Sequence, residues 1–390
     1  MADEDVRGPS KMAEITKQLV TNPLALEELH AQLGAQFRDD HGWRVPATYG
    51  NAKAEYEAVR DGGAGLIDLS SRGRIRVGGT EAVLFLNGLI TNDMKTLAHG
   101  RWMPAVFPTV QGRLIASIRV LRLPDDVARK SPEFVLDTEA NTRAVVLKTI
   151  ERFTIAGDFR VQDVTSETVM LTVQGNAAAS IAARLFGQDA SQLPRDGAVE
   201  TEWEGKPLTL LRATHTAEDG FDVIINNDHA ASLWDRIVVA GAKPVGHDTL
   251  ETLRIEAGIP RHGRDMDETN VVTETNLDDA VSFTKGCYIG QEIIVRIKHR
   301  GHVAKKLSGI MFDGADVVRA GTAIKTADDK EIGRVTSVAT SPRLSRNVAL
   351  GYLRYEFLKP GTKVEVPSEK GEVTGTVQPL PFVRGSWYAE

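Results

Sequence analysis

Cysteine is almost absent from this chain: its 390 residues include only Cys287. An intrachain disulfide is therefore excluded. The chain cannot alone supply the several thiolates of a zinc or iron–sulfur site, so we expect no metal centre of its own. No apolar run approaches the ~20 residues that cross a bilayer, and the acidic residues 3–5 are unlike the start of a signal peptide. We expect a cytosolic protein without membrane contact.

The chain also lacks an excess of basic charge. It has 47 basic and 53 acidic residues, a net charge of -6, which argues against a surface built for nucleic acid. The fingerprints of P-loop, zincin, nucleophile-elbow and Rossmann sites are absent as well. A length of 390 residues predicts two or three domains.

Strand and helix patterns predict an α+β fold. Residues 114–120 alternate apolar and wetter side chains as a strand does, and residues 134–136 are the expected hairpin partner. Residues 73–79 predict another strand, followed by a helix over 80–90 with Thr80 as its N-cap. A second set of strands is expected at 208–213 and 221–225, and further helices are expected at 140–152, 229–240 and 249–257. Two packed α+β units would result.

From about residue 303 the pattern changes to short β-rich runs separated by Gly, Asp and Pro. Such runs predict a small antiparallel barrel. We therefore divide the chain into an N-terminal extension (1–29), a region of two interleaved α+β units (30–302) and a C-terminal β-barrel (303–390).

The most unusual segment, residues 285–306, holds Cys287 and much positive charge, with Glu292 as its only acid. Its cationic side chains are Lys285, Arg296, Lys298, Arg300, Lys305 and Lys306. The segment is a candidate anion or partner site, and a solvated basic face is the equal alternative. Lys285 and two nearby glycines would favour an exposed thiolate at Cys287, whereas a lone cysteine is more often buried and inert.

Two further segments carry candidate binding groups. Glu218 and Asp219 precede a glycine at a strand entrance. A carboxylate there can accept two N–H donors from an amide-like ring edge, and a plain polar turn is the simpler alternative. In the helix over 249–257, Glu251 and Arg254 are three residues apart and can pair.

These segments, taken in order, resemble one family. Residues 64–73 (AGLIDLSSRG), 85–93 (FLNGLITND), 218–221 (EDGF) and 253–258 (LRIEAG) are similar to landmarks of the aminomethyltransferases, which include the tetrahydrofolate-dependent T-protein of the glycine cleavage system. Residues 285–292 (KGCYIGQE) resemble the signature of the YgfZ-type folate-binding branch. The resemblance covers nearly the whole chain. It implies a three-domain ring, two α+β units plus a C-terminal antiparallel β-barrel, around a central folate.

The resemblance also implies roles for single residues. Glu218 matches the acid that holds the pterin, and Arg254 matches the second arginine of a family motif whose first arginine is Leu250 here. Ala116 and Ser117 stand where the family carries an aspartate thought to assist aminomethyl transfer. A charged group missing from a reacting centre costs orders of magnitude in rate. We therefore expect no glycine-cleavage activity.

The implied function is that of a tetrahydrofolate-binding protein that supports the assembly or maintenance of iron–sulfur enzymes, including a tRNA-methylthiolating one. Cys287 would supply a functional thiol, with Lys285 beside it. The basic stretch 296–306 would contact the glutamate or polyglutamate tail of the folate, an acidic partner protein or RNA. Two alternatives remain open: a folate-dependent aminomethyl- or demethylating transferase of glycine-cleavage type, and a folate-free scaffold.

Overall fold

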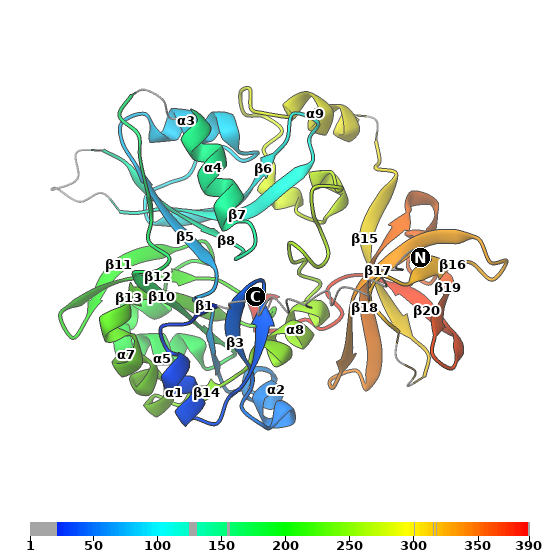
Figure 1. Cartoon of the computed structure of the whole chain (residues 1–390), viewed down its shortest axis with the longest axis horizontal. Coiled ribbons are helices and arrows are strands. Elements are labelled where there is room, and N and C mark those ends of the chain that lie inside the picture. The colour runs from blue at the N-terminus through cyan, green and yellow to red at the C-terminus, as the bar shows by residue number, and fades with distance from the viewer. Residues whose placement is uncertain are drawn as a thin grey trace, which may run out of the picture.

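The computed structural model describes residues 22–124, 131–153, 157–299, 301–314, 316 and 318–388. Its strands form three open sheets and one closed barrel. Figure 1 shows three lobes, which are two α+β units and the barrel. The expected α+β class and C-terminal antiparallel barrel are confirmed. Of the predicted N-terminal extension, only the part from residue 22 onward lies within the described residues.

The first unit is a five-stranded antiparallel sheet of order β6-β7-β8-β5-β9, with two helices packed on it. In β7 the side chains at 114, 116, 118 and 120 are buried and those at 115, 117 and 119 are half-buried, because successive side chains of a strand point to opposite faces. The predicted pairing of this strand with the 134–136 segment is confirmed. The elements are β5 (Gly73–Gly78), α3 (Ala82–Leu89), β6 (Arg101–Pro108), β7 (Leu114–Arg122), β8 (Glu133–Thr138), α4 (Arg143–Phe153) and β9 (Arg160–Asp163).

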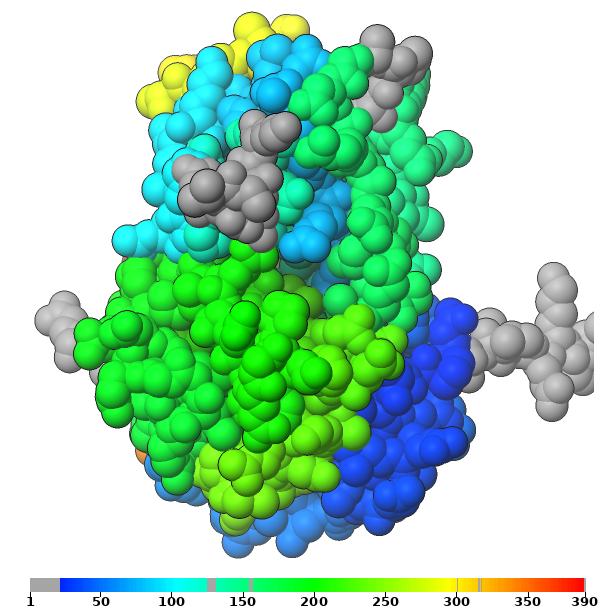
Figure 2. Space-filling view, turned by 90° about the vertical axis from the view of Figure 1, so that its left-hand side faces the viewer, coloured from blue at the N-terminus to red at the C-terminus, as the bar shows by residue number. Residues whose placement is uncertain are grey.

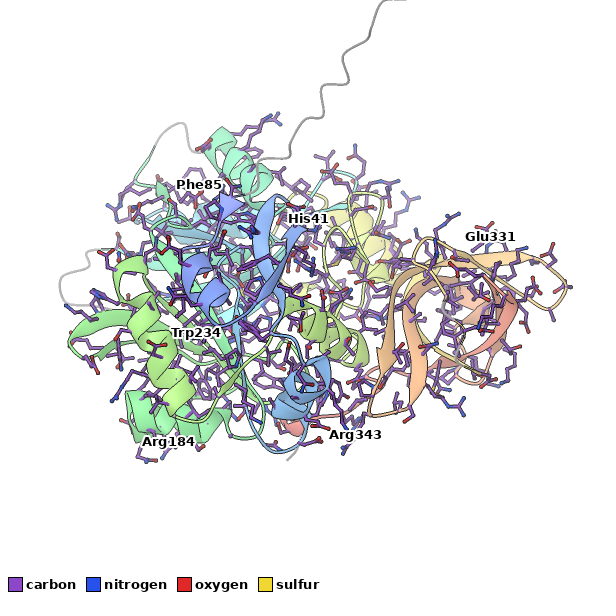
Figure 3. All side chains as sticks on the ribbon, turned by 60° about the horizontal axis from the view of Figure 1, so that its bottom comes forward. His41, Phe85, Arg184, Trp234, Glu331 and Arg343 are labelled. Atoms are coloured by element: carbon purple, nitrogen blue, oxygen red, sulfur yellow. The ribbon has the colours of Figure 1, made fainter. Side chains whose placement is uncertain are left out.

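The second unit is a six-stranded sheet of order β11-β12-β13-β10-β4-β14, joined by a small sheet of order β1-β3-β2. Strand β4 precedes the whole first unit in the chain, so the two units are interleaved. Figure 2 shows the blue N-terminal residues packed beside the green chain of this unit. There His30 meets the fully buried Trp234, labelled in Figure 3, with ring centroids 4.8 Å apart. The elements are β1 (Asn22–Pro23), α1 (Glu27–Gln32), β2 (Gln36–Asp40), β3 (Trp43–Thr48), α2 (Ala52–Arg60), β4 (Gly65–Asp68), β10 (Thr168–Gln174), α5 (Ala178–Phe186), α6 (Gln188–Ser191), β11 (Ala198–Trp203), β12 (Lys206–Arg212), β13 (Gly220–Asn226), α7 (Asn227–Val239), β14 (Lys243–Pro244) and α8 (His247–Glu256).

The barrel closes in the order β15-β18-β17-β16-β19-β20 around an apolar core. Its strands are β15 (Lys305–Phe312), β16 (Ala323–Lys325), β17 (Glu331–Ser341), β18 (Arg346–Arg354), β19 (Lys363–Ser368) and β20 (Gly371–Gln378). Helix α9 (Gln291–His299) precedes the barrel, and the short 3-10 turns are η1 (Val272–Glu274), η2 (Asp278–Ala280), η3 (Tyr355–Phe357) and η4 (Ser386–Tyr388). Within the described ranges, no helix is long and apolar enough to span a bilayer.

Two local expectations need correction. The helix expected over 80–90 begins at Ala82 after Glu81, and Thr80 does not cap it. Instead the Thr80 N–H donates to Oδ2 of Asp158 at 2.8 Å. No helix is expected over 291–299 from the sequence, yet this stretch forms α9 with Ile294 buried, because its apolar residues recur at helical spacing between the charges.

A buried charge cluster ties the second unit to the barrel. Glu256, the last residue of α8, is fully buried and accepts hydrogen bonds from Tyr56 (2.8 Å), Arg60 (2.9 Å) and the Ser341 hydroxyl at the end of β17. Arg60 also pairs with Glu218 at 2.8 Å. A buried charge without a partner is costly, so these contacts fix α2, α8 and the barrel in one arrangement.

Replacing Glu256 by alanine should leave the buried donors of Tyr56 and Arg60 short of acceptors. Breaking a buried pair costs roughly 3–5 kcal/mol, so urea unfolding followed by circular dichroism should show Glu256→Ala destabilised by about that amount. The control is Glu57→Ala on α2, whose half-exposed carboxylate lies 3.7 Å from Lys53. It should cost less than about 1 kcal/mol. Equal losses in the two variants would contradict a special role for the buried cluster.

Candidate functional site

A small cavity, here called the central cavity, lies where α8 meets the segments that lead into and out of the two large sheets. Its wall is made by Leu69, Ser71, Arg72, Glu139, His215, His247, Leu250, Glu251, Arg254, Ile259, Pro260 and Arg261. The cavity has a volume of about 70 Å³. One water molecule needs roughly 10–15 Å³ of such space, so the cavity has room for a few waters.

Behind the wall, one arginine is shared by two buried carboxylates. Arg119 on β7 lies 2.6 Å from Asp137 and 2.7 Å from Asp222. Burial by itself raises the pKa of Asp222, but His215 and Arg119 outweigh burial and hold this pKa well below its usual range. Nε2 of His215 lies 3.0 Å from each carboxylate oxygen of Asp222. Asp222 is therefore a fixed anion that holds the His215 ring in the cavity wall.

Arg254 lines the cavity, as does Leu250 one turn before it on α8. The Arg254 guanidinium donates to Asp265, to Glu251 and to the Ser337 hydroxyl at 2.6 Å. The pair of Glu251 and Arg254 expected from their spacing is thus present. The Arg254 Nε–H has no hydrogen-bond partner in the described part of the chain although it is buried. An unpaired buried donor costs about 1–3 kcal/mol, so this atom is a candidate ligand contact.

The rest of the charged wall is a chain of ion pairs. Nε of Arg72 donates to Asp137 at 2.7 Å, and another nitrogen of Arg72 contacts Glu139. Nε of Arg261 donates to Glu139 at 3.2 Å, and its NH2 group pairs with Asp40. Burial raises the pKa of Glu139, but the two arginines lower it far more, so Glu139 stays ionised. Each of these charged side chains is therefore already in an ion pair with another.

Glu218 lies in the turn ahead of β13, and the wall of the central cavity does not include it. One oxygen of its buried carboxylate accepts from Arg60 at 2.8 Å. The other oxygen accepts from the Ser386 N–H at 2.7 Å and from the Ser386 hydroxyl at 2.6 Å. Both oxygens therefore join the second unit to the C-terminal segment. The pterin contact expected for Glu218 stays a prediction, and it requires these hydrogen bonds to be exchanged.

Ala116 and Ser117, the two positions where the resemblance implies an aspartate in the family, lie on opposite faces of β7. Ala116 is fully buried in the core of the first unit. Ser117 is half-buried and shares a strand face with Arg119, because residues two apart in a strand point the same way. The strand face that carries the arginine between Asp137 and Asp222 therefore has a hydroxyl at 117. The expected loss of glycine-cleavage activity stays a prediction.

Cys287 is exposed, so the interpretation of a buried, inert thiol is wrong. Lys285 is buried, and its Nζ donates to the carbonyl oxygens of Asn87 (2.7 Å), Ile90 (2.9 Å) and Asn92 (2.7 Å) around the end of α3. Burial lowers the pKa of Lys285 to about 8. An ammonium has three N–H donors, and these three contacts with backbone carbonyl oxygens use all of them. Activation of the thiol by Lys285 stays a prediction.

The basic stretch 296–306 is divided between two elements, and none of its described cations lines the central cavity. These cations are Arg296 and Lys298, exposed on α9, and Lys305 and Lys306, half-buried on β15. Arg300 lies outside the described residues. Lys306 pairs with Asp278 at 3.2 Å. Contact of this surface with a folate tail, an acidic partner or RNA stays a prediction.

Sequence reasoning missed five charged or titratable wall residues, which are Arg72, Glu139, His215, His247 and Arg261. They are far apart in the chain, and only the packing of the two units brings them together. One local signal was available for His215. It lies seven residues before Asp222 across a turn, a spacing that lets a histidine and an aspartate meet at the mouth of a hairpin.

Comparisons with known proteins agree with this fold. The GCVT N-terminal domain model matches residues 26–285, and the model of the glycine cleavage T-protein C-terminal barrel domain matches residues 305–384. An aminomethyltransferase of Rubrobacter xylanophilus is 34% identical over 364 residues, covering 92% of this chain and 93% of the relative. An aminomethyltransferase of Geobacillus kaustophilus is 31% identical over 365 residues, covering 92% and 98%.

A solved structure is also similar over most of its length. The crystal structure of glycine cleavage system aminomethyltransferase T from Bartonella henselae matches with a TM-score of 0.84 and 25% identity, covering 93% of this chain and 98% of that chain. These matches confirm the expected superfamily. Membership of the YgfZ-type branch stays a prediction.

The native protein should react with one equivalent of Ellman's reagent per chain without denaturant, because its only thiol is exposed. The absorbance of the released thionitrobenzoate counts the reacting groups. Cys287→Ser should release none, which controls for reaction elsewhere. A thiol that reacted only after unfolding in guanidinium would contradict the exposed position of Cys287.

Proposed function

Since this chain belongs to the glycine cleavage T-protein family, we propose that it binds a tetrahydrofolate in the central cavity and exchanges a one-carbon group with it. The observation that carries the proposal is the wall formed by α8, where apolar Leu250 lies beside the unpaired Nε–H of Arg254. Glu251 adds a carboxylate with 28% of its side chain exposed. A pterin is a flat ring with an amide-like edge, so apolar contacts, an acceptor and a donor suit it.

The cavity must open to admit this ligand. A whole folate is much larger than the few waters that fit in about 70 Å³. The wall side chains therefore have to move, and any ion pair that opens must be replaced by contacts to the ligand. Binding is then coupled to a rearrangement of the wall, with Arg254 and Glu251 as the groups that turn toward the pterin edge.

We extend the proposal to polyglutamylated tetrahydrofolates. The contact between Arg254 and Asp265 separates the central cavity from a groove of about 510 Å³ that Asp265 also lines. The groove is lined by four cations, Arg264, Lys305, Arg334 and Arg354, and by three acids, Asp265, Asp267 and Glu331. A γ-linked glutamate tail carries one carboxylate per added residue, and the four cations would be the groups that attract it.

The relatives named above are aminomethyltransferases, which makes an aminomethyl carbon the first choice for the transferred group. The proposal thus takes the alternative of a glycine-cleavage-type transferase in place of the expected loss of that activity. With Ala116 and Ser117 where the resemblance implies an aspartate, the chain then needs another group to handle the proton. When bound, tetrahydrofolate would supply the nucleophilic amine nitrogens. The chain's own residues would hold the pterin at α8, orient it and exclude water from the enclosed wall.

Support of iron–sulfur enzymes is the second candidate, favoured by one specific observation. Cys287 is exposed within the KGCYIGQE segment, so its sulfur is accessible to a partner. A single thiol cannot hold a cluster, so a partner protein or a small thiol would complete the ligand set. This role uses a different surface from the central cavity and is separable from it by mutation.

Filling the cavity should weaken folate binding. Leu250→Trp places a bulky ring in the wall, and an overpacked contact typically costs about 1–3 kcal/mol, which corresponds to roughly a five- to 150-fold loss of affinity. Anaerobic calorimetric titration with tetrahydrofolate and its polyglutamates measures the effect. The control Leu84→Trp, at a side chain that is 67% exposed, should bind like the wild type.

The same titration tests the contact predicted for Glu218. Glu218→Ala should bind more weakly than the wild type if Glu218 turns toward the pterin, and unchanged affinity would end that assignment. Absence of binding by the wild type would leave the folate-free scaffold in its place.

The thiol role is tested in cells. In a strain that lacks this protein, Cys287→Ser should fail to restore the activity of iron–sulfur enzymes while binding tetrahydrofolate as the wild type does, because Cys287 is not part of the cavity wall. Leu250→Trp tests the opposite case, with an intact thiol and impaired binding. Full restoration by Cys287→Ser would remove the thiol from the mechanism.

A further inference from the structure

His215 differs from the other titratable groups of the central cavity wall. The others are held in ion pairs or packed against the backbone: Arg72, Glu139, His247, Glu251, Arg254 and Arg261. His247 is the other histidine, and its Nε2 lies 2.8 Å from the carbonyl oxygen of Asp68. Burial lowers the pKa of His247, which keeps its ring neutral. His247 resembles His215 in having no hydrogen-bond partner at Nδ1 among the described residues, but its Nε2 is bound to a neutral carbonyl oxygen, whereas Nε2 of His215 is bound to a carboxylate.

The surroundings of His215 are those of an acid–base histidine. Its Nε2 lies 3.0 Å from both oxygens of Asp222, and Asp222 is a fixed anion 2.7 Å from Arg119. A ring nitrogen bound to a carboxylate carries the hydrogen, which leaves Nδ1 with the lone pair. Nδ1 has no hydrogen-bond partner among the residues that the structure describes. The ring is held at one nitrogen and available at the other.

Charged and titratable groups surround this ring on several elements. They are Asp222 on β13, Arg119 on β7, Asp137 on β8 and Glu139 just after it, Arg72 just before β5, His247, Glu251 and Arg254 on α8, and Arg261 after α8. Asp222 is the group in direct contact with the imidazole, so it stabilises the imidazolium that forms on proton uptake.

We propose that His215 accepts the proton from the amine nitrogen of the bound pterin while that nitrogen takes up the one-carbon group. The inference rests on the proposed function and adds its proton-transfer residue. In this step Nδ1 of His215 takes the N–H proton, and the electron pair of the nitrogen forms the new N–C bond. The donor is a thiol-borne aminomethyl group. Its C–S bond breaks with the electron pair on sulfur, and His215 returns the proton to that thiolate.

No oxidant or reductant is needed, because one N–H and one C–S bond are exchanged for one N–C and one S–H bond. Asp222 and Arg119 do not face the ligand in this arrangement. They act as positioning residues, since they fix the orientation and the tautomer of the imidazole. The hydroxyl of Ser117 and the methyl group of Ala116 cannot take this proton at neutral pH.

The test compares the wild type with His215→Gln, Asp222→Asn and the control His229→Gln, whose side chain belongs to α7 and not to the cavity wall. Calorimetric titration with tetrahydrofolate in two buffers of different ionisation enthalpy gives the affinity and the number of protons exchanged on binding. Single-turnover transfer from an aminomethylated lipoyl carrier protein, followed from pH 5.5 to 9, gives the rate and its pH profile.

We expect His215→Gln to bind tetrahydrofolate within about threefold of the wild type and to lose roughly 10²–10⁴-fold in transfer rate, the usual contribution of a general base. A general base that already carries a proton cannot accept another, so the wild-type rate should fall toward acidic pH, and this limb should be absent from His215→Gln. Asp222→Asn should move the limb, because the anion beside the ring is gone. His229→Gln should match the wild type in every measurement.

A His215→Gln variant that transfers at the wild-type rate with the same pH profile overturns the inference. A wild type that binds tetrahydrofolate but transfers nothing also overturns it, while folate binding stands. A wild type that does not bind overturns the proposed function and the inference together. Far-UV circular dichroism shows whether His215→Gln is folded. If it is not, His215→Asn is judged by the same criteria.

Discussion

Charge that is buried must be paired, and this constraint holds the molecule together. Arg119 joins the first unit to the second by lying between Asp137 and Asp222. Glu256 joins α8 to α2 and, through a hydroxyl, to the barrel. The contacts of Arg119 with Asp222 and of Glu256 with Ser341 cross junctions between parts of the fold, where an unpaired charge would cost several kcal/mol. The relative position of the three lobes in Figure 1 therefore depends on buried polar contacts as well as on apolar packing.

The same constraint decides what the central cavity can do. Its wall is made of charges that already have partners, so a ligand has to offer better contacts than those it displaces. The wall atoms without a hydrogen-bond partner within the described residues include Nε of Arg254 and the Nδ1 atoms of His215 and His247. The Nε–H of Arg254 suits ligand binding, and the Nδ1 atom of His215, held from behind by a carboxylate, suits proton transfer. Because the wall has to rearrange when the ligand enters, the pairing of His215 with the buried Asp222 is the contact that keeps the proton acceptor in place.

Family membership explains the fold of this chain better than its chemistry, because function depends on the site that a fold carries. The T-protein architecture is present from the first unit to the barrel. The resemblance implies that Ala116, Ser117 and Leu250 depart from the family pattern, although only Leu250 of these lines the cavity, and an exposed Cys287 lies outside it. A transferase with a different proton acceptor and a folate-binding protein with a functional thiol both retain the fold and use different residues.

Local patterns in the sequence were enough to determine the fold class and much of its course. The alternation in β7 and the short runs of the barrel follow from the period of two in a strand, which depends only on neighbouring residues. The spacing of Glu251 and Arg254 likewise predicted their contact, because three residues make nearly one helical turn.

Tertiary structure alone decided which polar groups meet. Glu218 pairs with Arg60, which is 158 residues away in the chain, and Lys285 donates to carbonyl groups almost 200 residues away. Neither partner can be recognised from the local sequence, since a buried acid can pair with any cation, and a buried ammonium with any acceptor, that packing brings near. The contact between Arg119 and Asp222 joins two sheets and exists only once both have formed. The sequence determined the elements because their periodicity is local, and the fold determined the site because buried charges pair with whatever packing brings within reach.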